Sequence, residues 1–99
     1  MIDWTFDELK TWVAIRKPGW PSTSIAVNDR PTLDAAQEFV GGLVEMVPNQ
    51  LRVDGEPIQI LVNEEGLWKN LPVNPTASHM CANNIVGNAW VLVGKARWT

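Results

Sequence analysis

The sequence predicts an α+β domain in which a small antiparallel or mixed sheet of about five strands packs against one main α-helix. Residues 32–41 carry the start and stop signals of a helix, and several short runs of branched apolar residues are separated by turn residues. A short second helix or turn is indicated near residues 74–82. The 99 residues are 45% hydrophobic and 19% charged, so we expect residues 1–99 to form a single domain.

The first segment combines two conflicting signals. Thr5 and Glu8 form a capping box, so residues 1–10 are expected to be a short helical or irregular lead-in. The β-branched and aromatic residues that follow favour a strand over residues 11–16. A loop rich in proline and glycine comes next, and residues 24–28 are then expected to return as the hairpin partner of that strand.

Residues 32–41 give the clearest helix prediction. Thr32 can accept hydrogen bonds from the first free amides, and either Gly41 or Gly42 can adopt the left-handed turn that ends a helix. Phe39 widens an apolar stripe that we expect to pack against the sheet. The other members of this stripe are Leu33, Ala36 and Val40.

Two runs behind this helix are predicted to be antiparallel strands, at residues 43–47 and 58–63. Asp54 and Gly55 form a strong turn dipeptide between them, and residues 50–53 either prolong the first strand or make a wide loop. Alternation along the second run places three apolar residues on the face that is expected to meet the helix. These are Ile58, Ile60 and Val62.

The last strand is predicted within residues 85–98, the most apolar run of the chain, and we expect it to be central in the sheet. Gly87 and Asn88 interrupt this run near its start. A glycine inside a strand often marks a bulge or a close approach of another backbone. The bend would turn Asn88 toward neighbouring segments.

Several motifs follow one another along residues 11–94: WVAIRKPG, PTLDAAQEFVGGLVEMVP, ILVNEEG, NLPVNPTAS and IVGNAWVLVG. Their order resembles the family known as the domain of unknown function numbered 3846. The resemblance implies a compact α+β domain encoded by a bacteriophage or mobile element, and no established reaction. Residues 1–10 and the six tryptophans depart from the usual pattern of the family.

Overall composition restricts the class of function. The formal net charge is -3, which tells against a nucleic-acid partner because a phosphate backbone favours a basic surface. Cys81 is the only cysteine, which fits a reducing cytoplasm. The resemblance to a phage-encoded family implies that this is the cytoplasm of an infected bacterial host. No apolar run reaches the ~20 residues of a membrane-spanning helix, so no membrane association is expected.

The sequence contains no complete catalytic or metal-binding set, so we expect no catalytic residue, metal or cofactor. His79 lies two positions before Cys81, but a short helix there would point the two side chains apart. One histidine and one cysteine are too few for a transition-metal site. Glu64 and Glu65 either form an acid and base pair or belong to a solvated turn in which Gly66 takes a positive φ.

The polar loop after residue 62 supplies most candidate binding residues. Asparagine side chains can bind a polar ligand, or they can cap helices and stabilise turns, as Asn74 would before Pro75. Trp20 and Trp68 lie in loops, where an indole either covers the core or anchors a partner, and we expect both to be partly buried. The full set of candidates is Trp20, Asn63, Glu64, Glu65, Trp68, Asn70, Asn74 and Asn88.

These observations favour a non-enzymatic accessory protein of a phage or mobile element that acts by binding a host protein or other copies of itself. The alternative is a protein that binds a small molecule, such as a nucleotide, through the asparagine and glutamate side chains of the loop. A third hypothesis, an enzyme that uses Glu64 or Glu65 as acid or base, requires one of these carboxylates to lie buried in a cleft.

Overall fold

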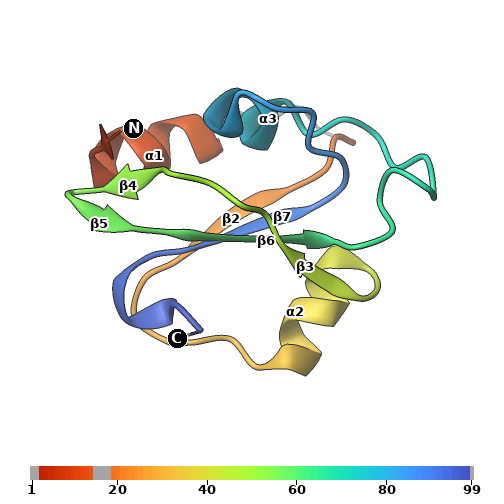
Figure 1. The fold of residues 1–99 in the computed structure, drawn as a ribbon, viewed down its shortest axis with the longest axis horizontal. Coiled ribbons are helices and arrows are strands. Elements are labelled where there is room, and N and C mark those ends of the chain that lie inside the picture. Colours follow the sequence, from red (N-terminus) through yellow and green to blue (C-terminus); the bar gives the residue numbers. More distant parts are fainter. Residues whose placement is uncertain (1–2, 15–18, 99) are drawn as a thin grey trace.

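The computed structural model describes residues 3–14 and 19–98, which form three layers. The main sheet lies in the middle, with helix α2 (Leu33–Val40) on one face and helices α1 (Phe6–Ala14) and α3 (Pro75–Cys81) on the other (Figure 1). The α+β class is therefore confirmed, and so is the short helix near the predicted range 74–82. The sequence predicted one main helix against the sheet, whereas α1 and α3 add a second helical layer on the opposite face.

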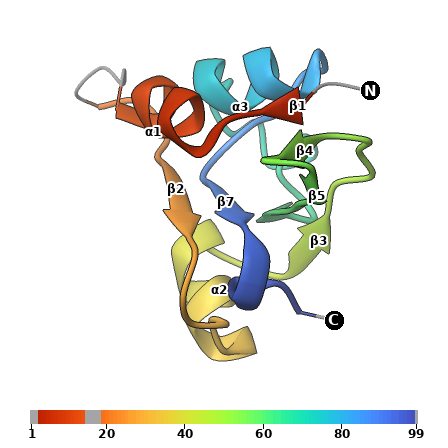
Figure 2. The same cartoon turned by 90° about the vertical axis from the view of Figure 1, so that its left-hand side faces the viewer.

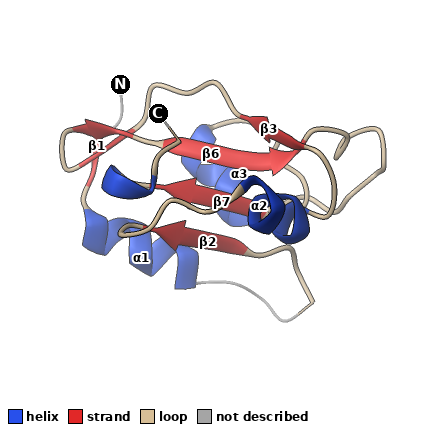
Figure 3. Ribbon diagram, turned by 90° about the horizontal axis from the view of Figure 1, so that it is seen from below, coloured by secondary structure: helices blue, strands red, loops and turns tan. Residues whose placement is uncertain are grey.

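The main sheet has the strand order β2-β7-β6-β3, which Figure 3 shows from below. Its strands are β2 (Thr23–Ala26), β3 (Val44–Met46), β6 (Gln59–Asn63) and β7 (Ala89–Leu92). β7 is central, as predicted from its apolar sequence. β2 pairs with β7 in parallel, whereas β6 is antiparallel to both β7 and β3, so the sheet is mixed.

A second, smaller sheet has the order β1-β4-β5. It consists of β1 (Asp3–Trp4), β4 (Arg52–Val53) and β5 (Glu56–Pro57). The predicted Asp54-Gly55 turn joins β4 to β5, and β3 and β6 pair antiparallel around this small hairpin as expected. Residues 50–53 therefore form neither a simple extension of β3 nor a plain loop.

The strand predicted at residues 11–16 is wrong, because α1 continues through Ala14; residues 15 and 16 lie outside the described part of the chain. The capping signal prevails over the β propensity of the segment. Thr5 Oγ1 accepts a hydrogen bond from the Glu8 amide at 3.1 Å, and the helix then buries Leu9 completely. The hairpin predicted between residues 11–16 and 24–28 is consequently wrong as well, and β7 occupies the place of the expected partner.

Helix α2 begins and ends as the sequence predicts. Thr32 Oγ1 accepts a hydrogen bond from the Ala35 amide at 3.1 Å, and Gly41 takes the left-handed C-cap conformation with φ 81°. Ala36 and Val40 are buried on the sheet side, in agreement with the predicted stripe. Leu33 departs from it, because it lies in the first turn of the helix and remains 55% exposed.

The two faces of the main sheet carry separate hydrophobic layers. On one face Ile60 and Val91 pack with Leu9 of α1 and Met80 of α3. Figure 2 shows α1 and α3 above the sheet and α2 below it. Ile58 and Val62 belong to the same layer as Ile60, so the prediction that this set meets α2 is wrong.

The opposite face of β6 meets α2, through Leu61, which packs with Ala36, Leu92 and Ala96. Ala96 belongs to a 3-10 helix, Gly94–Ala96, that follows β7. The two sets of alternating residues in β6 were predicted correctly. Because helices cover both faces of the sheet, alternation alone does not show which set meets α2.

Candidate functional site

Asn74 lies where the polar loop enters α3, and its side chain is fully buried. Its Oδ1 accepts hydrogen bonds from the Ala77 amide and from Thr23 Oγ1, both at 3.0 Å. Its Nδ2 donates to the carbonyl oxygens of Gly87 at 2.9 Å and Ser22 at 3.3 Å. Both N–H groups and both lone pairs of the amide are thus engaged. Asn74 caps α3, as predicted, and also joins this helix to the segments before β2 and β7.

Asn88 follows the predicted bend before β7. Gly87 has φ 72°, and Asn88 Oδ1 accepts a hydrogen bond from the Ser22 amide at 2.8 Å. Its Nδ2 donates to the carbonyl oxygen of Phe39 at 2.8 Å. The side-chain amide of Asn88 therefore connects the start of β7 to the start of β2 and to the last turn of α2. This agrees with the prediction that the bend directs Asn88 toward neighbouring segments.

Asn63 ends β6 and is buried, with 5% of its surface exposed. Its Nδ2 donates to the carbonyl oxygen of Val40 at 3.1 Å, and its Oδ1 accepts from the Glu65 amide at 2.8 Å. We refer to Asn63, Asn74 and Asn88 as the asparagine seam. All three amides bind groups of the chain itself, which favours the structural alternative for these residues.

The turn over residues 64–70 is held by its own backbone. The amides of Gly66, Lys69 and Leu71 donate to the carbonyl oxygens of Asn63, Glu65 and Gly66 at 2.8 to 3.1 Å. These bonds make the turn a compact unit whose ends are fixed to β6 and to the core.

The sequence predicted a positive φ at Gly66, but in this turn the residue with a positive φ is Asn70, at 56°. A Cβ at Gly66 would lie 2.9 Å from Val86 Cγ2 and 3.3 Å from the carbonyl oxygen of Asn63. Glycine is therefore needed here for close packing between the turn and the segment that enters β7.

This turn, at the right of Figure 1, contains two consecutive large apolar residues that are exposed. Trp68 is 80% exposed and Leu67 is 68% exposed. We refer to Leu67 and Trp68 as the apolar tip. The expectation of partial burial is wrong for Trp68, whereas Trp20 is 44% exposed and is partly buried as expected.

The remaining polar candidates surround the apolar tip. Glu64 and Asn70 are exposed, and Glu65 is half-buried. Glu64 donates its amide to the carbonyl oxygen of Leu43 at 2.8 Å, and Leu43 is itself 52% exposed. The solvated-turn alternative therefore describes Glu64, and the apolar side chains, rather than the carboxylates, distinguish this end of the molecule.

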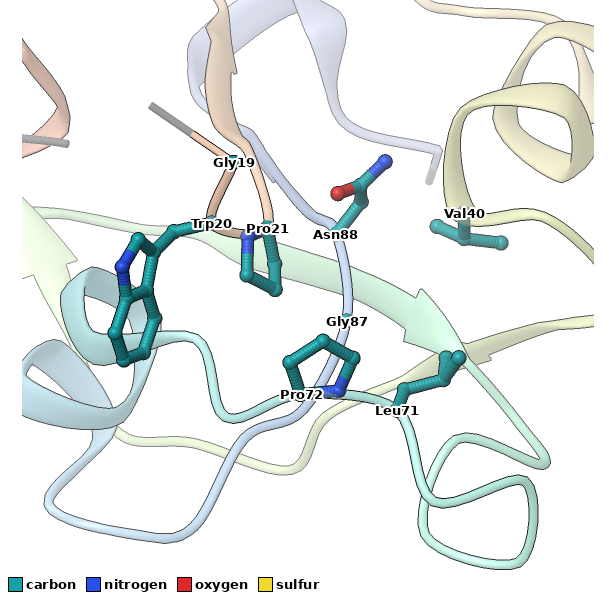
Figure 4. Close-up of a pocket in the computed structure, with 8 residues that line it drawn as sticks. All are labelled: Gly19, Trp20, Pro21, Val40, Leu71, Pro72, Gly87 and Asn88. Carbon is teal, nitrogen blue, oxygen red and sulfur yellow. The ribbon is translucent and has the colours of Figure 1, made fainter. Parts of the chain in front are cut away.

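Two shallow hollows flank the loop. The first has a volume of about 310 Å³, and Figure 4 shows Trp20 at one rim and Leu71 at the other, with Gly87 between them. The second has a volume of about 270 Å³ and includes Asn63, Glu64 and Leu67. The structure thus brings Trp20 and Asn88 to one hollow and Asn63 and Glu64 to another, and the predicted candidates do not form one pocket.

Sequence reasoning missed an aromatic cluster between α1 and α3. The rings of Trp12 and His79 stack with centroids 4.0 Å apart, and Trp4 meets Trp12 edge to face at 6.1 Å. Trp4 belongs to β1 and Trp12 to α1, so their contact depends on the helix that the strand prediction for residues 11–16 excluded. Half-burial raises the pKa of the Cys81 thiol, which disfavours the thiolate that a nucleophile needs.

The described residues contain no group of three or more His, Cys, Asp or Glu side chains that could hold a metal ion. Among the same residues, the structure has no helix of sufficient length and apolar character to span a bilayer.

Comparison with protein families gave one finding. Residues 11–97 match the model of the family described as Domain of unknown function (DUF3846). Searches of curated proteins and of solved structures gave no match.

Proposed function

This chain belongs to the family described as Domain of unknown function (DUF3846), and we propose that it is a non-enzymatic protein that binds a protein partner through the apolar tip. In this proposal it is an accessory protein of a phage or mobile element that acts in the host cytoplasm. The partner is a host protein or a second copy of the chain. The exposed fraction of Trp68, 80%, is the observation that carries the proposal.

The energy available at the apolar tip supports such a contact. A tryptophan side chain offers roughly 200 Å² of surface, so covering an indole of this exposure corresponds to about 4 kcal/mol. The backbone bonds within residues 64–70 hold the turn before a partner arrives, and this reduces the entropy that binding would otherwise lose. A tryptophan on a fixed turn has the properties of an interface hot spot.

The chemistry of the surrounding residues favours a protein partner over a polar small molecule. The side-chain amides of the asparagine seam could otherwise hydrogen-bond a nucleotide, but they already bind backbone or hydroxyl groups of the chain. The net charge of -3 also disfavours phosphate groups. An acid and base reaction lacks its required geometry at Glu64, since this carboxylate is exposed on a turn.

Binding is tested with the immobilised chain and its Trp68→Ala variant, each exposed to lysate of a bacterial host. Proteins that the wild type retains and Trp68→Ala loses, identified by mass spectrometry, are the expected result. Leu33→Ala is the matched control, because Leu33 is also an exposed apolar residue but lies in α2.

Self-association is tested in the same pair by sedimentation velocity. A dimer that Trp68→Ala converts to a monomer identifies the partner as a second copy. The proposal is rejected when wild type and Trp68→Ala retain the same proteins and both sediment as monomers at all concentrations.

One observation favours a small-molecule site as a second candidate function. The hollow of about 270 Å³ is lined by the exposed residues Glu64, Asn83 and Asn84, which leave polar groups accessible beside apolar ones. A thermal-shift screen against nucleotides and metabolites tests this candidate, and a stabilising compound should lose its effect in Asn84→Ala. The absence of any shift across the panel rejects it.

A further inference from the structure

The outer edge of β2 offers backbone hydrogen-bonding groups. β2 pairs with β7 on one side, and no other strand of the described residues lies on its other side. The carbonyl oxygens of Ser22 and Ala26 accept hydrogen bonds from the β7 side, from the amides of Ala89 and Val93. Because successive residues of a strand direct these groups to opposite sides, the N–H and C=O groups of Ile25 and the N–H group of Val27, just after β2, face away from β7.

Helix α1 forms the second wall beside this edge. Figure 2 shows α1 above β2 at the outer side of the sheet. A groove of about 770 Å³ lies between them, lined on the helix by Phe6, Lys10 and Val13 and on the strand by Ile25 and Val27. This volume falls within the range of roughly 300–1,000 Å³ that is usual for binding sites. One wall thus supplies apolar side chains and the other supplies a strand edge.

The charge of the groove indicates the chemistry of its occupant. Lys10 is the charged residue among the described residues that line it, and its Nζ lies 4.6 Å from the centre of the Phe6 ring. This contact holds the ammonium group at the groove. The other described residues that line the groove are uncharged, so this local cation favours a carboxylate from the occupant.

We propose that this groove binds an extended peptide segment of a partner protein, which adds a strand beside β2 and places an Asp or Glu carboxylate near Lys10. β2 has four residues, so the added strand has about four to six residues. Its backbone bonds the outer groups of Ile25 and Val27, and alternate side chains enter the apolar space below α1. This surface is separate from the apolar tip and extends the proposed function to a second contact.

The geometry favours a foreign peptide over a second copy of β2. Antiparallel pairing of two β2 edges about a twofold axis perpendicular to the sheet would place both α1 helices on the same face of the joined sheet. It would also bring two copies of Lys10 into the shared groove, where their like charges repel.

The test selects a random heptapeptide library, displayed on filamentous phage, against the immobilised full chain. Enriched sequences are expected to carry Asp or Glu among alternating apolar or β-branched residues. Synthetic copies of them should bind Lys10→Glu about tenfold more weakly, because a charge-assisted contact becomes a repulsion, and should bind Lys10→Arg as they bind the wild type.

A second variant probes the strand edge. Val27→Pro removes one outward N–H while leaving the bonds to β7, a substitution that edge strands tolerate. It should also weaken the peptide about tenfold. Trp68→Ala should leave peptide affinity unchanged, so this inference and the proposed function can fail separately. Lys10 is exposed on α1, and the Lys10 variants therefore remain informative if Val27→Pro does not fold.

Four results would overturn the inference. The first is that no peptide enriches over a surface without the chain. The second is that the selected peptides bind wild type, Lys10→Glu and Val27→Pro equally well. The third is that Trp68→Ala alone abolishes their binding, which assigns them to the apolar tip. The fourth is a wild-type dimer that Val27→Pro dissociates, which shows that a second copy occupies the edge.

Discussion

Two members of the asparagine seam, Asn63 and Asn74, lie within a few residues of the apolar tip in sequence, yet the fold uses the seam and the tip in opposite ways. Asn63 and Asn74 are polar and buried, while Leu67 and Trp68 between them are apolar and exposed. Polar residues in a loop are usually the candidates for binding, but here the polar residues are buried and the apolar ones are exposed. The asparagine side chains donate hydrogen bonds to backbone carbonyl groups of neighbouring segments, whereas the apolar side chains remain available to a partner.

The difference follows from the position of each residue relative to the bend before β7. Gly87 turns the chain at this point, where backbone groups of several different elements come together. Asn74 and Asn88 bind four of them: the carbonyl oxygens of Gly87, Ser22 and Phe39, and the Ser22 amide. Within the turn at residues 64–70, by contrast, the amides of Lys69 and Asn70 bind the carbonyl oxygens of Glu65 and Leu67, without the help of a side chain.

The largest expected effect is at the centre of the seam. Asn74→Ala removes the cap of α3 and leaves Thr23 Oγ1 and the carbonyl oxygen of Gly87 without this partner in the interior, so the free energy of unfolding should fall by about 3 to 4 kcal/mol. Urea denaturation measures this change. The matched control is Asn84→Ala at an exposed asparagine, which should change stability by less than about 0.5 kcal/mol.

Equal losses in both variants would remove the distinction between the seam and other asparagines. A loss below about 1 kcal/mol for Asn74→Ala would show that water replaces its hydrogen bonds, since a buried group left unsatisfied costs more than this.

The bend itself should give the second largest effect. In Gly87→Ala the new Cβ would lie 2.8 Å from Leu71 Cδ1 on a backbone with φ 72°, so both overlap and conformational strain disfavour it. The free energy of unfolding should fall by about 2 to 3 kcal/mol. Thermal and urea unfolding measure the change.

Gly55→Ala serves as its control, because Gly55 has φ 81° but no atom within 4 Å of the added Cβ. It should cost about 1 kcal/mol, from strain alone. A cost for Gly87→Ala no greater than that for Gly55→Ala would contradict a close contact between the bend and Leu71.

The smallest effect on stability is expected at the apolar tip. Trp68→Ala should change the free energy of unfolding by less than about 0.5 kcal/mol, because its side chain is 80% exposed and contributes little to the core. Combined with the loss of a binding partner, this result would separate the tip from the seam completely. A loss above about 1 kcal/mol would instead assign the indole a structural role.

Much of the local structure was predictable from consecutive residues. The ends of α2 follow from Thr32 and Gly41, and the cap of α3 follows from Asn74 before Pro75. The central position of β7 follows from its apolar run. The capping box predicted the start of α1, but its second half was missed, because Trp12 and the β-branched residues there carry strand propensity, which the Thr5 cap and the burial of Leu9 override.

The candidate site was predictable only in part. The loop after β6 and the bend at Asn88 were both singled out, and contacts between Gly66 and Val86 confirm that the turn and the bend lie close together. The exposure of Trp68 was not predictable, because the same indole could have covered the core had the turn folded inward. The groove below α1 depended on recognising that helix, so it was missed with it.

The amino-acid sequence by itself determined the class of the domain, both ends of α2, the start of α3 and the positions of most strands, because caps, turns and alternation act between residues a few positions apart. Only the tertiary structure decided that β2 runs parallel to β7, which face of β6 meets α2, and which asparagines are engaged internally. These outcomes depend on contacts such as Ser22 with Asn88, 66 positions apart, whose geometry exists only after the layers have packed.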